Sequence, residues 1–427
     1  MSDPQTPATR DDGPYENVFL SLGTAKDRSV YTKHVTPRIL DNVELDGLYE
    51  GDGFARRIID LPAEEMVRAG FEIEGVDDGR EVIAELEGIS TATSLCDALR
   101  WDALHGGAVI VMLANDGGTL DDPLNDDAVK AIEQLRVYDR WQISHYEKYE
   151  DPADMRFGKT KRYMIMPSNG MPYTVHETRC IVFSGMPVPA RVRDRNDGWG
   201  ASRLQQCYEQ IIRFGMSHVW ANALLERAQQ AVHGIPNLSS VLHSKGGEEL
   251  VRRRIDLVDM ARSINNTVII DSEESYELKS TPFSGVPDIL DRFGLALSAT
   301  TGLPESLLFG RHQGGLNNTG RADLENWYAK IGQEQNTKLL PAIDRLVSLQ
   351  LRATGNYQDD YLIKVRPLIV PSEKDKAETD HRRAQTFQIL SDIGALDASE
   401  IRKMLPDEGY SIDDTELMPE DGEETPE

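Results

Sequence analysis

Two His-x-Thr triplets are the part of this sequence whose side chains most directly suggest chemistry. They are His34-Val35-Thr36 and His176-Glu177-Thr178. Two such triplets can together hydrolyse a phosphodiester, because one imidazole acts as the base, the other acts as the acid, and the hydroxyls hold the phosphate. Triplets this short also arise by chance, so a hydrogen-bonded or solvated structural histidine is the favoured interpretation of each. Hydrolysis stays open as the alternative.

The acidic residues give no sign of a metal site. Adjacent acidic pairs have neither a histidine nor a third carboxylate at a spacing that would complete a set of metal ligands, and they fit solvated faces: Asp121 and Asp122, Asp126 and Asp127, Glu273 and Glu274. No P-loop, Gly-x-Ser-x-Gly, His-Glu-x-x-His or dinucleotide-binding motif occurs in the chain. We therefore expect no catalytic residue, no cofactor and no bound metal.

The three cysteines, Cys96, Cys180 and Cys207, are widely separated and form no Cys-x-x-Cys motif. This usage predicts reduced core thiols in a cytosolic protein, not a disulfide framework or a zinc site.

The densest basic cluster lies between two long helical stretches and consists of Arg252, Arg253, Arg254 and Arg262. Such a cluster is typical of a surface that contacts nucleic acid or an acidic partner. A solvated helix face with ion pairs to Glu248 and Glu249 explains it equally well.

Composition limits the class of protein. The chain has 427 residues, a net charge of -26 and 39% hydrophobic residues, which is enough for two or three domains with a sizeable core. Its polar, acidic N-terminus is not a signal peptide, and its longest apolar run, Ala108–Ala114, fits one buried strand and not a membrane span. A chain this acidic does not attract DNA overall, although solubility alone explains the charge. Residues 1–16 and the acidic tail 407–427 are expected to be disordered.

Two helical segments around a glycine- and asparagine-rich loop organise the C-terminal half. The first covers Pro287–Thr301, the loop is FGRHQGGLNNTG (Phe309–Gly320), and the second helix reaches Arg352. The second helix extends over about 30 residues, or roughly 45 Å, and Pro341 should kink it because proline removes an amide donor. A loop between such helices suits a part that moves or that lines a passage.

The rest of the chain mixes helices and strands, so the predicted fold class is α+β. Periodicity predicts a helix around Phe54–Val67 that Pro62 bends or divides, and a long helix over Ser202–Gln230. The remaining helices are expected at Gly79–Glu87, Thr93–His105, Glu248–Arg262, Glu373–Ile393 and Ser399–Leu405. Strands are expected at Ala108–Ala114, Leu135–Ser144, Arg162–Pro167, Thr178–Gly185, Thr267–Asp271, Ser275–Thr281 and Leu362–Ser372.

The sequence resembles the portal proteins of tailed bacteriophages, in the phage-associated group related to the N-terminal part of anti-CBASS phosphodiesterases. Five segments carry this resemblance, in the order of the family: Leu48–Gly75, Asp102–Met112, Val137–Ser144, Trp199–Phe214 and Gly302–Tyr328.

The resemblance implies a portal-type architecture. After the N-terminal residues 1–16, it implies a mixed wing (17–200), two stem helices (201–230 and 282–303) around a small clip (231–281), a channel or tunnel loop (304–320), a long kinked helix that returns to the wing (321–372), a short helical crown (373–406) and the tail (407–427). Such proteins form a ring, typically of twelve copies, at one capsid vertex. Double-stranded DNA is packaged through the ring by the terminase and is later ejected through it.

The resemblance also implies roles for particular residues. The loop residues that would face DNA are Arg311, His312, Gln313, Gly314, Gly315, Asn317 and Asn318. The arginine cluster Arg252, Arg253, Arg254 and Arg262 would lie on the clip and face a partner. An acidic ring repels DNA along its wall and so favours sliding over binding.

The implied partners are other copies of the chain, the terminase large subunit, head–tail adaptor proteins, the major capsid or scaffolding protein, and DNA held without sequence readout. The implied location is the portal vertex of the virion, with host cytoplasm during assembly and no membrane. The alternative is a two-histidine phosphodiesterase that uses His34 and His176 against cyclic oligonucleotides. A smaller connector of the same particle fits less well with a chain of this length.

Overall fold

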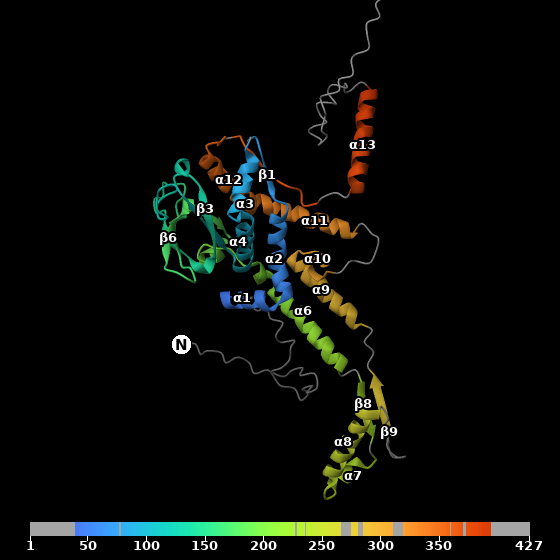
Figure 1. Cartoon of the computed structure of the whole chain (residues 1–427). Helices are drawn as coiled ribbons and strands as arrows, with labels where there is room; N and C mark the ends of the chain where they lie inside the picture. The colour runs from blue at the N-terminus through green and yellow to red at the C-terminus, as the bar shows by residue number, and fades with distance from the viewer. Residues whose placement is uncertain are drawn as a thin grey trace, which may run out of the picture.

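The computed structural model describes residues 39–76, 78–226, 229–234, 236–265, 275–280, 285–310, 319–358, 360–369 and 373–393. A mixed body of helices and sheets lies at one end of an elongated molecule, and two long helices connect it to a smaller unit at the other end (Figure 1). The predicted α+β class is confirmed. The expected disordered termini 1–16 and 407–427 lie outside the described residues.

Four helices open the body: α1 (Asn42–Gly51), α2 (Gly53–Arg68), α3 (Gly79–Gly88) and α4 (Thr91–His105). Asp41 begins α1 with a capping box to Glu44, and Asp52 begins α2 by accepting from the amides of Phe54 and Ala55. Pro62 does not divide α2, because it packs in the core beside Ile58 and Ile59 and this packing outweighs the lost hydrogen bond.

Two three-stranded antiparallel sheets form the rest of the body. In the first, β2 (Ala108–Ala114) lies between β3 (Ile132–Asp139) and β7 (Cys180–Phe183). In the second, β5 (Thr160–Ile165) lies between β4 (Ile143–Lys148) and β6 (Tyr173–His176). β2 is buried on both faces: Ile110 and Met112 join the main core, whereas Val109 and Val111 pack with Ile143, Ile165 and Trp199. This double burial explains its continuous apolar sequence.

The strand expected over Leu135–Ser144 is wrong as a single element. A 3₁₀ turn, η3 (Arg140–Gln142), divides it into β3 and β4, and the Asp139 carboxylate accepts from the Trp141 amide at 2.7 Å to hold that turn. The chain therefore passes from one sheet to the other at this point. A further pair, β1 (Phe71–Glu74) with β10 (Leu362–Val365), joins the first and last parts of the body.

The two connecting helices are α6 (Arg203–Glu226) and α9 (Val286–Thr301), which pack side by side and are called the stem pair below (Figure 1). Between them in sequence lies the distal unit, which consists of β8 (Gln229–Gly234), α7 (Leu238–His243), α8 (Gly247–Asn265) and β9 (Ser275–Ser280). The long helix was expected to reach Gln230, but residues 229 and 230 pair with Ser280 and Lys279 in the β8–β9 ribbon. Strand pairing here overrides local helix propensity.

After α9, the short α10 (Glu305–Phe309) precedes the long helix, which comprises α11 (Thr319–Glu334), a π-helical segment η5 (Gln335–Leu339) and α12 (Leu340–Thr354). A kink was predicted at Pro341, and the departure from regular α-helix that the structure shows is the π segment, which ends two residues before this proline. The helix α13 (Glu373–Asp392) stands apart from the body (Figure 1). The helix expected at Ser399–Leu405 and the strand expected at Thr267–Asp271 lie outside the described residues. Over the described ranges, none of the helices combines the length and the apolar character that a bilayer crossing demands.

Candidate functional site

An aromatic cluster anchors the stem pair to the body. Phe54 of α2 lies 5.2 Å from Phe214 of α6 and 5.4 Å from Phe309 of α10, measured between ring centroids, and the last two rings are 5.5 Å apart. Gly294 of α9 faces this cluster, and a Cβ placed there would lie 3.4 Å from the Phe309 ring. The missing side chain therefore lets α9 approach α6 and α10 closely.

The outer face of the stem pair exposes apolar side chains. On α6 these are Ile212, Met216 and Val219, which we call the α6 stripe, and their helical spacing places them along one side of the helix. Trp220 and Leu224 are exposed further around α6, and Ile289 and Leu295 are exposed on α9. The sequence showed the apolar periodicity of α6 but not that half of it faces outward. A row of exposed large apolar side chains is typical of an interaction surface.

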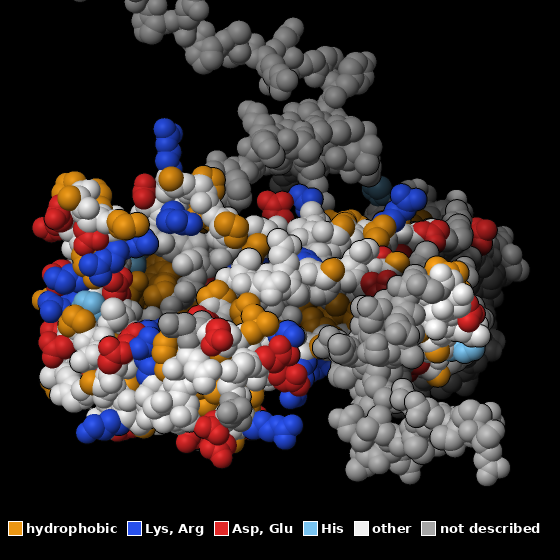
Figure 2. Space-filling model, turned by 90° about the horizontal axis from the view of Figure 1, so that it is seen from above, with side chains coloured by type: hydrophobic (Ala, Val, Ile, Leu, Met, Phe, Trp, Pro, Cys, Tyr) orange, Lys and Arg blue, Asp and Glu red, His pale blue; other side chains and the backbone are white. Residues whose placement is uncertain are grey.

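Charges on the body do not form a surface of one sign. In the view from above, acidic and basic side chains are interspersed over the described part of the face (Figure 2). Elsewhere on the body, charged side chains are paired, as in Arg100 with Glu64 at 2.6 Å and Arg366 with Glu72 at 2.9 Å. The described part of this face therefore does not resemble the basic footprint of a protein that grips nucleic acid.

The π segment of the long helix is fastened to the body by polar side chains. The Gln335 amide donates to the Met66 carbonyl at 2.7 Å, and Lys338 forms an ion pair with the buried Asp102 of α4. At Glu334, the last residue of α11 before the π segment, Arg203 of α6 donates two hydrogen bonds of 2.7 and 2.9 Å to the carboxylate. The widened turn is thus the place where α4, α2 and α6 all hold the long helix.

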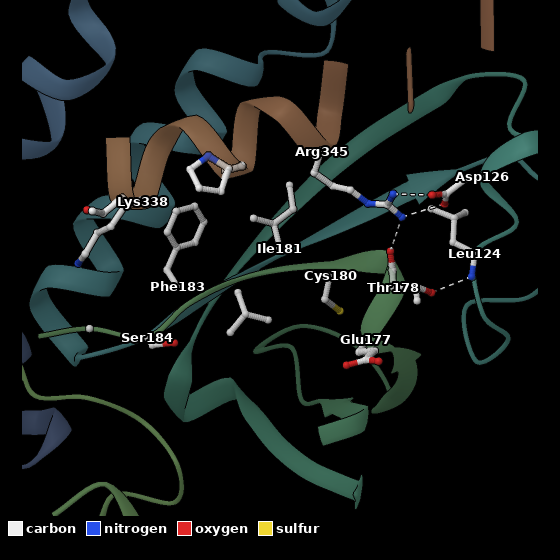
Figure 3. Close-up of a pocket in the computed structure, with 15 residues that line it drawn as sticks. Leu124, Asp126, Glu177, Thr178, Cys180, Ile181, Phe183, Ser184, Lys338 and Arg345 are labelled. Atoms are coloured by element: carbon white, nitrogen blue, oxygen red, sulfur yellow. Dashed lines mark hydrogen bonds and ion pairs between the residues drawn. The ribbon is translucent and has the colours of Figure 1, made fainter. Parts of the chain in front are cut away.

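Further along, α12 is fastened to the loop before β3. Arg345 makes a bidentate pair with Asp126 at 2.6 and 2.9 Å and donates to the Thr178 carbonyl at 3.1 Å (Figure 3). Arg352 pairs with Asp127 at 2.5 Å. Sequence reasoning assigned Asp126 and Asp127 to a solvated face. Asp127 is solvated, with 83% of its side chain exposed, whereas Asp126 is only partly exposed because it holds Arg345 of α12.

The loop residues predicted to face DNA, Arg311 to Asn318, lie outside the described residues. The flanking residues are described: Gly310 ends α10 with a φ of +67°, and α11 begins at Thr319. A cavity of about 410 Å³ lies between the end of α9 and α11, with Trp327 and Lys330 in its wall. Burial lowers the pKa of the Lys330 ammonium, Arg203 lowers it further, and Glu334 opposes both.

The predicted arginine cluster is only partly described. Arg252 and Arg253 are exposed on α8, Arg254 is half-buried, and the side chain of Arg262 lies outside the described set. Leu250, Ile255 and Leu257 are exposed on the same helix. The described part of the distal unit therefore presents basic and apolar side chains together, a combination found at protein interfaces.

The two predicted histidines do not form a described pair. His34 lies outside the described residues. His176 is buried and its Nδ1 accepts from the Thr178 amide at 3.3 Å, which caps the 3₁₀ turn η4 (Glu177–Arg179). The Thr178 hydroxyl lies 3.0 Å from the same nitrogen and accepts from the Leu124 amide at 2.8 Å. The groups that would hold a phosphate are therefore engaged with their own chain.

Burial also determines the state of the thiols. Cys207 is buried and desolvation raises its pKa to about 12, while burial likewise raises the pKa of Cys96 and Cys180. All three cysteines are free, as predicted from their spacing. Among the residues that the structure describes, no group of His, Cys, Asp or Glu is arranged to hold a metal ion.

Comparisons with known proteins cover nearly the whole chain. The chain is 27% identical over 390 residues to the "Anti-CBASS protein Acb1" of Caulobacter sp. (strain RHG1). The matched region covers 88% of this chain and 62% of that protein. It thus spans less than two thirds of the length of that relative. It is 25% identical over 413 residues to an uncharacterized protein of Haemophilus influenzae, and this match covers 94% of this chain and 92% of that protein.

Solved structures show the same fold. A chain in the neck of a native gene transfer agent particle with C12 symmetry aligns over 88% of this chain and 97% of that chain, with a TM-score of 0.51 and 14% identity. The family model described as "Phage portal protein" matches residues 43–389. This range contains the body, the stem pair, the distal unit and the long helix, and so this chain belongs to the phage portal protein family.

Proposed function

We propose that the chain is one subunit of a ring that forms the portal of a tailed phage and encloses a channel for double-stranded DNA. The observation that carries the proposal is the α6 stripe, a row of apolar side chains on the outer face of the stem pair. A second copy that packs against this stripe would remove it from water, at about 25 cal/mol for each Å² of apolar surface buried. Repeating that contact around an axis closes a ring.

The channel follows from the position of the stem pair in such a ring. Subunits that meet through their stem helices place these helices around the axis, with the distal units at one end and the α13 helices at the other. Residues 304–320 follow directly after α9 and are proposed to approach the DNA, with Arg311 to Asn318 at the tip. The net charge of -26 per copy keeps DNA from adhering to the wall.

The distal unit is the proposed docking surface of the ring. Its exposed Arg252 and Arg253, with the adjacent Leu250, suit a protein partner that carries carboxylates and apolar groups. We assign it to the terminase during packaging and to the head–tail adaptors afterwards. The wing would face the capsid or scaffolding protein, and the finished ring would reside at the portal vertex of the virion after assembly in the host cytoplasm.

Catalysis by this chain is the second candidate function, and the name of the Caulobacter relative is its support. The portal protein family is a structural one, and the capping role of His176 opposes the two-histidine mechanism. A direct assay decides between them: the purified chain should not cleave cyclic oligonucleotides. Cleavage that disappears in the double variant His34→Ala, His176→Ala would support the phosphodiesterase.

Ring formation is tested with a pair of matched variants. Met216→Glu places a charge in the α6 stripe, whereas Met155→Glu places the same charge on a fully exposed loop of the body. Native mass spectrometry and negative-stain images should show rings for the parent chain and for Met155→Glu, and monomers for Met216→Glu. Rings that form equally well with Met216→Glu would remove the stripe from the interface, and a parent chain that never forms rings would contradict the proposal.

A further inference from the structure

The strand β7 forms one edge of its sheet. It pairs antiparallel with β2, from Ala108 opposite Phe183 to Val111 opposite Cys180, and none of the described strands pairs with its other side. A cavity of about 790 Å³ lies along this other side, and it is lined by the whole of β7 as well as Ser184 and Gly185. The free edge of β7 therefore borders a groove (Figure 3).

The opposite wall of the groove is a face of the long helix. It consists of Thr337 and Lys338 from η5 and of Pro341, Ala342 and Arg345 from α12. The two long side chains of this wall lie at opposite ends of it, where Arg345 is held by Asp126 (Figure 3). Lys338 is held by Asp102 of α4. Between them only the compact side chains of Pro341 and Ala342 face the strand. The middle of the groove stays open because its long side chains are held elsewhere.

An open groove beside an edge strand is suited to one kind of ligand. Every second residue of an edge strand directs its N–H and C=O groups away from the sheet, and these groups form a template for another strand. A strand added there lies about 4.8 Å from β7. Main-chain hydrogen bonds provide the affinity in this mode of binding, and the groove receives alternate side chains. Ile181 and Phe183 supply an apolar floor to the groove.

The chain itself enters the body near one end of this groove. The Leu40 amide donates to the side chain of Gln205 at 2.9 Å, less than one turn after Ser202. Ser202 lies against α4 at Ala103, while the Gly185 amide donates to Asp102 of the same helix. Leu40 and the C-terminal end of β7 therefore lie against adjoining parts of α6 and α4.

The segment just before this entry point has the composition of a strand. Residues 29–36 read Ser-Val-Tyr-Thr-Lys-His-Val-Thr, of which five are β-branched or aromatic. Thr36 precedes Pro37, which favours an extended backbone at that position. The residues between this segment and Ile39 span about 10 Å when extended, which matches an entry point next to the groove.

We propose that residues 29–36 of the same molecule bind the free edge of β7 as an added strand, parallel to β7. The direction follows from the entry point, because the segment must finish at the Gly185 end of the groove. The sheet would then have the order β3, β2, β7 and the added strand, with α12 along its new edge. The proposal concerns the body of one subunit and stands independently of ring formation.

Hydrogen–deuterium exchange of the full-length chain tests the proposal. Lys33→Pro removes an amide from the added strand and should prevent pairing, whereas Ala8→Pro lies outside the proposed strand and serves as the control. In the parent chain and in Ala8→Pro, amides of residues 29–36 and half of those in β7 should exchange at least tenfold more slowly than in Lys33→Pro. Amides of β2 report whether the body stays folded, and deletion of residues 1–38 should expose β7 to the same extent.

Two results would overturn the proposal. In the first, residues 29–36 exchange at the rate of an unstructured peptide, or β7 is equally protected in Lys33→Pro and in the deletion variant. In the second, protection of β7 is present in assembled rings and absent from the monomeric fraction, which would show that the strand belongs to a neighbouring copy.

Discussion

Lys338, from the π segment of the long helix, contacts the carboxylate of Asp102, which is fully buried in α4. The same carboxylate also accepts from the amide of Gly185 at the end of β7. One buried charge thus connects the long helix, the helical layer and the central sheet. The charge of Asp102 is neutralised by Lys338, which the π segment η5 places beside it.

Removal of this lysine should destabilise the body. Lys338→Met leaves the Asp102 charge buried without its partner, which should cost about 3 kcal/mol in the free energy of unfolding. Urea denaturation at pH 7 measures the loss. Lys364→Met is the matched control, because the pair of Lys364 with Glu74 is exposed on both sides and contributes less than about 1 kcal/mol. Equal losses in the two variants would contradict a special role of the buried pair.

Asp116 should make the free energy of unfolding depend on pH in the acidic range. Burial alone would raise the pKa of its carboxyl, but the amides of Asn125 and Gly118 and the guanidinium of Arg179 outweigh this and hold its pKa below the ordinary value of 3.8. The stabilisation is therefore complete above pH 3.8 and is lost as the pH falls through the lower folded value.

The variant Asp116→Asn should be about 3 kcal/mol less stable than the parent at pH 7, since it leaves the Arg179 charge buried. The difference between the two should shrink in urea denaturation below pH 3.8. Asp121→Asn removes the carboxylate of a half-exposed pair with Arg162 and should cost less than about 1 kcal/mol at pH 7. A difference that is constant with pH would show that the hydrogen bonds of Asp116 do not distinguish its charged form.

His176 should contribute a second pH dependence, at milder acidity. Burial lowers the pKa of its imidazole below the ordinary value of 6.5, although Glu177 opposes this. The unfolded chain thus binds the proton more readily, and stability falls as the pH drops below 6.5. His176→Asn keeps a side chain that can cap η4 and should reduce the loss of melting temperature between pH 7 and pH 5. An unchanged pH profile would show that the imidazole binds a proton equally well in the folded and the unfolded chain.

Gly294 should tolerate one methyl group and nothing larger. A Cβ there would lie 3.4 Å from Phe309 and 3.7 Å from Phe214, which is ordinary contact or slightly closer. Gly294→Ala should change stability by less than about 1 kcal/mol, because better helix propensity offsets the closer contact. Gly294→Leu should cost about 1–3 kcal/mol by overpacking the aromatic cluster. Thermal unfolding of both variants provides the comparison, and equal stability of the two would show that the helices separate freely here.

Much of the fold was predictable because its elements carry strong local patterns. Ala108–Ala114 was predicted as one buried strand, and its two-sided burial confirms this with the same bounds. The helices at Gly79–Gly88, Thr91–His105 and Val286–Thr301 begin and end within two residues of prediction. These segments combine clear periodicity with glycine or polar residues at their ends.

The errors occurred where distant residues decide the local structure. The short strands β6 and β1 have little pattern of their own and exist because β5 and β10 pair with them. Asp126 looks like a solvent-facing residue until α12 brings Arg345 to it from more than 200 residues away. Of the predicted site residues, the structure describes the side chains of Arg252, Arg253, Arg254 and His176, and the DNA-facing role of Arg311 to Asn318 stays a prediction.

The ribbon of β8 and β9 places the first and last residues of the distal unit next to each other, with Gln229 opposite Ser280. Whatever is inserted between these two positions can change in length or sequence while both stem helices keep their spacing. The distal unit between Gln229 and Ser280 can therefore be replaced as a whole during evolution. Under the function proposed above, a lineage could acquire a new docking specificity in this way and keep the stem contacts that are proposed to close the ring.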